Sequence, residues 1–206
     1  MPLIDRTLAD VLGAFSDPSP TPGGGSASAL AAATGLSLLA MVSQMSRTRT
    51  GSDEDRQVLE QSSSALLPLR DHVATLIDDD ARAYDEVVAA YRMAKATVEE
   101  KATRRTAVQS ALRGAAEVPL DVMRACQAGL TVAVDLARHG NPSARSDVGV
   151  ALELLMAALR GAALNVGVNL ESIDEPGWVD GVRSEVERLE AGATLLVSDA
   201  RSALIR

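Results

Sequence analysis

Hydrophobic residues recur with helical spacing along almost the whole chain. In the first segment, Leu8, Val11 and Leu12 fall on one side of a helix that the pattern predicts over Leu3–Phe15. Residues 16–25 then combine alternating prolines with three consecutive glycines, which is typical of a loop.

The next segment, residues 29–45, is apolar on every side, as expected of a helix at the centre of a fold. No charged residue occurs between Pro18 and Ser46, so a membrane span has to be considered. Prolines, glycines and serines keep the apolar run below the ~20 residues that a bilayer requires. We therefore interpret this segment as a buried helix, capped by Ser26 or Ser28.

Polar turns with glycine or proline divide the rest of the chain. We expect a kink at Pro68 and an interruption at Pro119, because proline lacks the amide proton that a helix interior needs. Gly140 is expected in a left-handed conformation that ends a helix before Pro142, and Ser143 or Ser146 would cap the following one. The predicted helices are 55–95, 97–139, 143–170 and 176–204.

The pattern as a whole predicts one all-α domain over residues 1–206, a bundle of about six or seven helices. No segment alternates with the period of two that a strand needs. Composition agrees: the chain has 35 alanines and only four aromatic residues, which suits helices packed through small side chains. The many apolar faces on a chain of this size also favour a dimer.

Charge and cysteine content narrow the function classes. The net charge is −8, whereas a nucleic-acid-binding protein normally carries a basic surface. Cys126 is the single cysteine, so an internal disulfide is impossible. The N-terminus has no apolar signal core. These features predict a cytoplasmic protein without nucleic-acid or membrane partners.

Asp78, Asp79 and Asp80 are consecutive, and on a helix they point about 100° apart, so they cannot converge on one metal ion. Asp80 alone falls on the apolar stripe of its helix. Burial there would raise its pKa and make it a candidate general acid or base. The alternative is an acid at the edge of the stripe.

Three further polar residues stand in apolar surroundings. Asp147 and Ser146 open a predicted helix, where either a capping role or a functional one is possible. Asn165 lies four residues before Asn169 on the most apolar helix, and a buried amide needs a partner in a ligand or another helix.

Gly23, Gly24, Gly25 and Ser26 precede a helix whose free amides suit an anion, although a flexible helix entry explains them equally well. The lysine of a nucleotide-binding P-loop is absent. His72 and His139 are isolated, so no metal site is predicted.

Four segments, in this order, resemble the cyclodeaminase/cyclohydrolase family of one-carbon folate metabolism. They are Thr21-Pro22-Gly23-Gly24-Gly25-Ser26-Ala27-Ser28, Leu76-Ile77-Asp78-Asp79-Asp80-Ala81-Arg82-Ala83-Tyr84, Val118-Pro119-Leu120-Asp121-Val122-Met123, and Gly140-Asn141-Pro142-Ser143-Ala144-Arg145-Ser146-Asp147 continuing to Gly161-Ala162-Ala163-Leu164-Asn165-Val166 and Asn169-Leu170.

The resemblance implies a stand-alone, all-helical homodimer that binds a reduced folate and needs no metal or further cofactor. It implies that 5-formimino-tetrahydrofolate closes to 5,10-methenyl-tetrahydrofolate with loss of ammonia, or that the methenyl form is hydrolysed to 10-formyl-tetrahydrofolate. The implied catalytic residues are Asp80 and Asp147. The implied substrate-binding residues are Gly23, Gly24, Gly25, Ser26, Asn141, Arg145, Ser146, Asn165 and Lys95.

Two other readings remain open. A non-catalytic helical dimer could keep the same fold, but it has no need for buried polar groups, which cost about 1–3 kcal/mol each when unpaired. A different small-molecule hydrolase could also use this scaffold.

Overall fold

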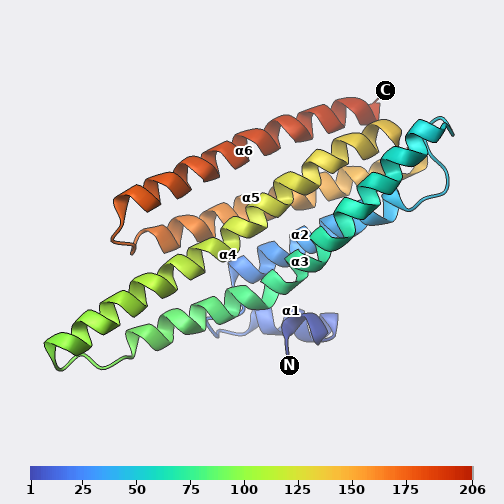
Figure 1. Cartoon of the computed structure of the whole chain (residues 1–206). Helices are drawn as coiled ribbons and strands as arrows, with labels where there is room; N and C mark the ends of the chain where they lie inside the picture. Colours follow the sequence, from blue (N-terminus) through green and yellow to red (C-terminus); the bar gives the residue numbers. More distant parts are fainter. Residues whose placement is uncertain (206) are drawn as a thin grey trace.

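The computed structural model describes residues 1–205, and within them it contains helices but no strand. Six α-helices and two short 3₁₀ helices form one bundle, which confirms the predicted fold class (Figure 1). The 3₁₀ helices are η1 (Leu3–Asp5) and η2 (Pro142–Ala144). The α-helices are α1 (Leu8–Ser16), α2 (Gly24–Ser43), α3 (Asp53–Tyr91), α4 (Val98–His139), α5 (Arg145–Leu170) and α6 (Pro176–Ile205).

The helix α2 is the centre of the bundle. It packs against α3, α4 and α5, and eleven of its twenty residues are buried. Its length and composition would suit a membrane span, but here they produce a core helix, as we expected. It begins at Gly24 rather than near Ala29, so the glycines form its first turn.

The two longest helices, α3 and α4, run antiparallel and project together beyond the ends of their neighbours, while α6 lies along α4 and α5 (Figure 1). Ser52 caps the start of α3, and Thr97 with Glu100 forms a capping box on α4. These caps explain where the long helices begin, and the turn between α3 and α4 occupies residues 92–97.

Several expected boundaries were wrong. Pro119 does not interrupt α4, which continues through it to His139. Gly140 has a φ of −69° and is not left-handed; a side chain there would meet the carbonyl oxygen of Leu136. Neither Ser26 nor Ser28 caps α2, whose N-cap is Gly23. The N-cap of α5 is Ala144, which makes no side-chain cap bond.

Candidate functional site

Asp80 of α3 binds the first turn of α2. Its Oδ2 accepts hydrogen bonds from the backbone N–H of Ser26 at 2.8 Å and from the Ser26 hydroxyl at 3.0 Å. Ser26 itself is fully buried. The first amides of a helix lack partners within that helix, so a carboxylate from a neighbouring helix performs the capping that Gly23 cannot.

The two hydrogen bonds from Ser26 do not fully replace the hydration that the Asp80 carboxylate loses on burial. Desolvation raises the pKa of the Asp80 carboxyl above its ordinary value, and the Ser26 hydrogen bonds only partly oppose that shift. A carboxyl with a raised pKa is a stronger base when ionised and holds a proton closer to neutral pH. Burial thus raises the pKa of Asp80 in the direction that its position on the apolar stripe predicted.

Two adjacent glycines allow this arrangement. A side chain at Gly25 would overlap the Asp80 carboxylate, and one at Gly24 would lie 3.3 Å from Asn165 Nδ2. Helix α2 thus brings Asp80 of α3 and Asn165 of α5 to either side of its N-terminus. The glycines are required here for close approach rather than for flexibility.

These residues line a cavity of about 320 Å³, at the small end of the range for ligand pockets. It lies between α2, α3, α4 and α5. This cavity is lined by five of the predicted residues, Gly23, Gly24, Gly25, Asp80 and Asn165. Ser26 lies next to it, hydrogen-bonded to Asp80. Its other walls are Pro20, Thr21, Tyr84, Val87, Ala115, Val168 and Asn169.

Sequence reasoning did not include Asn169 and Tyr84 among the site residues. Asn169 was visible as the second amide of a pair spaced by four residues on an apolar helix. Tyr84 follows Asp80 by one helical turn, so both side chains lie on the same face of α3.

The other predicted residues lie outside the Asp80 cavity. Asp147 is eighteen residues before Asn165 on the continuous helix α5, about 27 Å away along the helix axis. Asn141 accepts a bond from the amide of Ser143. The structure does not bring Asp147 and Asp80 together within one chain.

Asn141 and Arg145 line a separate cavity of about 370 Å³, and Ser146 is exposed on the next position of α5. Lys95 is exposed in the turn between α3 and α4 and does not line the Asp80 cavity.

The three consecutive aspartates have three different partners. Asp78 accepts from the amide of Leu3 at 2.6 Å, and Asp79 pairs with Arg82, whereas Asp80 faces α2. Across residues 1–205, no three His, Cys, Asp or Glu side chains are grouped to hold a metal ion.

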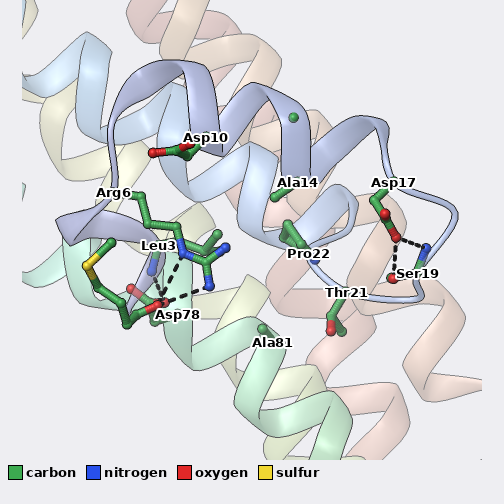
Figure 2. Close-up of a pocket in the computed structure, with 12 residues that line it drawn as sticks. Leu3, Arg6, Asp10, Ala14, Asp17, Ser19, Thr21, Pro22, Asp78 and Ala81 are labelled. Carbon is green, nitrogen blue, oxygen red and sulfur yellow. Dashed lines mark hydrogen bonds between the residues drawn. The ribbon is translucent and has the colours of Figure 1, made fainter.

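A larger, open cavity of about 790 Å³ lies beside the N-terminal segment (Figure 2). Figure 2 shows Asp78 beside Leu3, with Thr21 and Pro22 on the loop that leads toward α2. Thr21 also lines the Asp80 cavity, so this loop forms part of both walls. Asp10, Asp17 and Asp78 line the larger cavity together with Arg6 and apolar groups, which makes it a poor site for an anion.

Comparison with known proteins agrees with this architecture. The sequence model of the formiminotransferase-cyclodeaminase family matches residues 7–188. A methenyltetrahydrofolate cyclohydrolase of Methylorubrum extorquens is 41% identical over 140 residues, which cover 67% of this chain and 65% of that protein. A formimidoyltransferase-cyclodeaminase of Gallus gallus is 31% identical over 149 residues, 72% of this chain but 28% of that protein.

Among solved structures, formiminotetrahydrofolate cyclodeaminase from Thermotoga maritima superposes with a TM-score of 0.86 at 26% identity. The superposition covers 97% of this chain and 96% of the other. The family match extends over the Asp80 cavity and most of the bundle. The chain therefore belongs to the formiminotransferase-cyclodeaminase family.

Proposed function

We propose that this chain catalyses one-carbon chemistry on a tetrahydrofolate derivative, at the carbon that joins N5 and N10. The observation that carries the proposal is Asp80, whose pKa is raised by burial and whose carboxylate is fixed by Ser26 at the wall of a small cavity. Similarity to proteins named for two such reactions supports the substrate class. Neither reaction requires a metal or a redox cofactor.

The first reaction to consider is hydrolysis of 5,10-methenyl-tetrahydrofolate. Water attacks the cationic methenyl carbon, and ionised Asp80 takes the proton that the water loses. The bond from this carbon to N5 then breaks while the new hydroxyl group loses its proton and becomes the formyl C=O. N5 takes that proton, 10-formyl-tetrahydrofolate is released, and protonated Asp80 returns its own proton to the solvent. The name of the M. extorquens relative favours this reaction.

The second is the deamination of 5-formimino-tetrahydrofolate, the first reaction that the resemblance implied. N10 attacks the carbon of the protonated formimino group, ionised Asp80 takes the proton that N10 loses, and a tetrahedral carbon forms. Protonated Asp80 gives its proton to the departing nitrogen, so that ammonia leaves and the methenyl bridge closes. The name of the T. maritima structure favours this reaction.

The deciding experiment follows the near-ultraviolet absorbance of methenyl-tetrahydrofolate with the purified chain, against the spontaneous rate. Faster loss that disappears with Asp80→Asn supports the cyclohydrolase. No acceleration, together with ammonia release from the formimino substrate, supports the cyclodeaminase. Absence of both reactions, in a folded protein that binds neither folate, would contradict the proposal.

We also propose that the active form is a homodimer. Helix α5 exposes Val150, Leu164 and Val168, each with between 52% and 73% of its surface accessible, whereas its opposite face is packed into the core. Beside it, α2 exposes Met41 and carries no charge over its whole length. A second copy is the partner that this apolar surface fits best.

An antiparallel pairing of α5 with its copy is self-complementary. Ala157 lies midway between Val150 and Leu164, so a two-fold axis there would place these two residues in contact across the interface. The same axis would bring Glu153 opposite Arg160 of the other copy. It would also bring Asp147 of one copy to the turn of α5 that holds Asn165 of the other. Two predicted site residues that lie far apart within one chain would then share one site.

Mixing two inactive variants tests the dimer. Asp80→Asn and Asp147→Asn each damage both sites of their own homodimer. In a refolded mixture, half of the dimers carry one intact site, so about one quarter of the wild-type activity returns. A monomer in solution, or no recovery on mixing, would contradict the shared site.

A further inference from the structure

Helix α4 contains a proline with a specific structural consequence. Pro119 is buried within α4 and has no amide proton. The carbonyl of Ala115, four residues earlier, therefore lacks its partner within the helix. An unpaired carbonyl in a packed region requires another donor.

Asn169 of α5 supplies that donor. Its Nδ2 donates to the Ala115 carbonyl at 2.8 Å, and both residues line the Asp80 cavity. This bond fixes which side of the amide faces the protein. Among residues 1–205 no group donates to the Asn169 Oδ1, which is left as an acceptor at the cavity wall.

The side-chain amide of Asn165 is oriented in the same way. Its Nδ2 donates to the carbonyl of Gly161 at 2.8 Å, so its Oδ1 is also an available acceptor. Asn165 and Asn169 are four residues apart and lie one above the other on α5. No Lys or Arg of the described chain lines this cavity. The wall opposite α2 thus offers acceptors and suits a ligand edge that is rich in N–H donors.

We propose that the Oδ1 of Asn169 accepts a hydrogen bond from the 2-amino group of the pterin, that the Oδ1 of Asn165 accepts one from the adjacent ring N–H, and that Pro119 is a positioning residue that acts through Asn169. This inference rests on the proposed function, since it assumes a tetrahydrofolate ligand. It assigns the donor edge of the pterin to α5, and it leaves the one-carbon group toward Asp80 and the anionic tail outside the cavity.

The test compares two stable ligands in a binding titration. One is 5-formyl-tetrahydrofolate, and the other is its analogue with a methyl group in place of the 2-amino group. Wild-type protein should bind the analogue about tenfold more weakly, as expected for the loss of one good hydrogen bond. In Asn169→Leu this ratio should fall to about twofold. An unchanged ratio overturns the role of Asn169.

Pro119→Ala tests the positioning role. The new amide at position 119 would bond the Ala115 carbonyl within α4 and weaken the hold on Asn169. We expect the ratio between the two ligands to fall about threefold in this variant. Pro68→Ala is the matched control, because Pro68 lies inside α3 but is exposed and distant from the cavity.

The outcomes separate the two proposals. If wild-type protein binds neither ligand, the proposed function fails and this inference falls with it. If wild-type protein binds and discriminates but Pro119→Ala discriminates equally well, only the positioning role fails. A purely structural role for Pro119 would change the melting temperature of the variant and leave the ratio between the ligands unchanged.

Discussion

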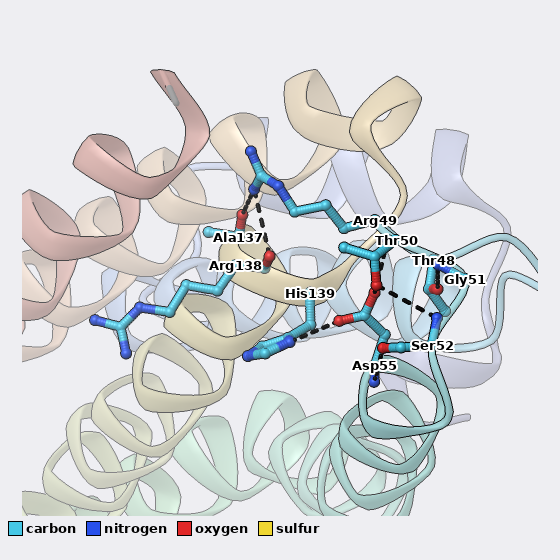
Figure 3. Close-up of polar contacts among 9 residues, drawn as sticks. All are labelled: Thr48, Arg49, Thr50, Gly51, Ser52, Asp55, Ala137, Arg138 and His139. Atoms are coloured by element: carbon cyan, nitrogen blue, oxygen red, sulfur yellow. Dashed lines mark hydrogen bonds and ion pairs between the residues drawn. The ribbon is translucent and has the colours of Figure 1, made fainter.

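Two carboxylates that lie far apart along α3 have different environments. Asp55, at the start of α3, accepts from the amide and the hydroxyl of Thr50, both at 2.7 Å, and lies 2.8 Å from His139 Nδ1 (Figure 3). Asp80 has Ser26 as its one hydrogen-bond partner within residues 1–205, and it lines a cavity.

Their pKa values shift in opposite directions. The Thr50 hydrogen bonds, with the contact to His139, hold the pKa of Asp55 well below its usual range. Burial raises the pKa of Asp80. Asp55 is a fully bonded structural anion, whereas Asp80 keeps capacity for a ligand. The two carboxylates thus differ in the number of their hydrogen-bond partners as well as in their burial.

The surroundings of Asp55 explain its structural role. The Arg49 guanidinium donates to the carbonyls of Ala137 and Arg138 (Figure 3). The backbone amide of Arg49 donates to the carbonyl of His139. The segment between α2 and α3 therefore covers the last turn of α4. Asp55 fixes this segment through Thr50, so three helices depend on it.

The largest expected effect comes from Asp80→Asn. Loss of its proton transfer should reduce turnover about 10³-fold, because general acid–base groups contribute 10²–10⁴-fold. The fold should remain, since Asn can still accept from Ser26. Steady-state rates and circular dichroism measure both effects. Asp79→Asn is the control, and equal losses in the two variants would remove the distinction that we draw.

Gly25→Ala should reduce turnover about 10²-fold, because the new methyl group overlaps the Asp80 carboxylate and must displace it. Gly24→Ala should have a smaller effect, since its methyl group would meet Asn165 at 3.3 Å. Gly114→Ala is the control, with no atom within 4 Å of the added carbon. Normal kinetics of Gly25→Ala would show that the position of Asp80 tolerates change.

Asp55→Ala should act on stability rather than on chemistry. Removal of its carboxylate leaves Thr50 and His139 without a partner, and we expect a loss of about 3 kcal/mol in the free energy of unfolding. Asp53→Ala is the control, because the Asp53 side chain is 99% exposed. Urea unfolding measures the difference. If the variant kept its stability but lost activity, Asp55 would have a functional role rather than a structural one.

The smallest expected effects are opposite pH dependences of stability. The lowered pKa of Asp55 stabilises the fold above the unfolded value of about 3.9. That contribution disappears as the pH falls toward the folded pKa. Asp80 has a raised pKa, so its ionised form costs stability as the pH rises through that pKa.

Melting temperatures of both Asn variants and the wild type, measured across acidic and neutral pH, give these two trends. Relative to wild type, Asp55→Asn should lose its disadvantage at low pH, whereas Asp80→Asn should gain stability as the pH rises. Parallel trends would show that the two carboxylates have similar environments.

The sequence by itself determined the helical bundle, the central position of the segment after the glycines, and Asp80 as the carboxylate on an apolar stripe. These features depend on local spacing, since residues three and four apart share a helix face. The same spacing showed that Asp80 lies on a different face of the helix from Asp78 and Asp79.

Only the tertiary structure decided which helices share a site. It placed Asp147 about 27 Å along α5 from Asn165, and it joined Asn169 to the carbonyl that Pro119 leaves free. The sequence predicted a break in α4 at Pro119. That prediction was wrong because local spacing does not show that a neighbouring helix offers the missing donor. Contacts between helices depend on packing across the bundle, and no local pattern in the sequence records them.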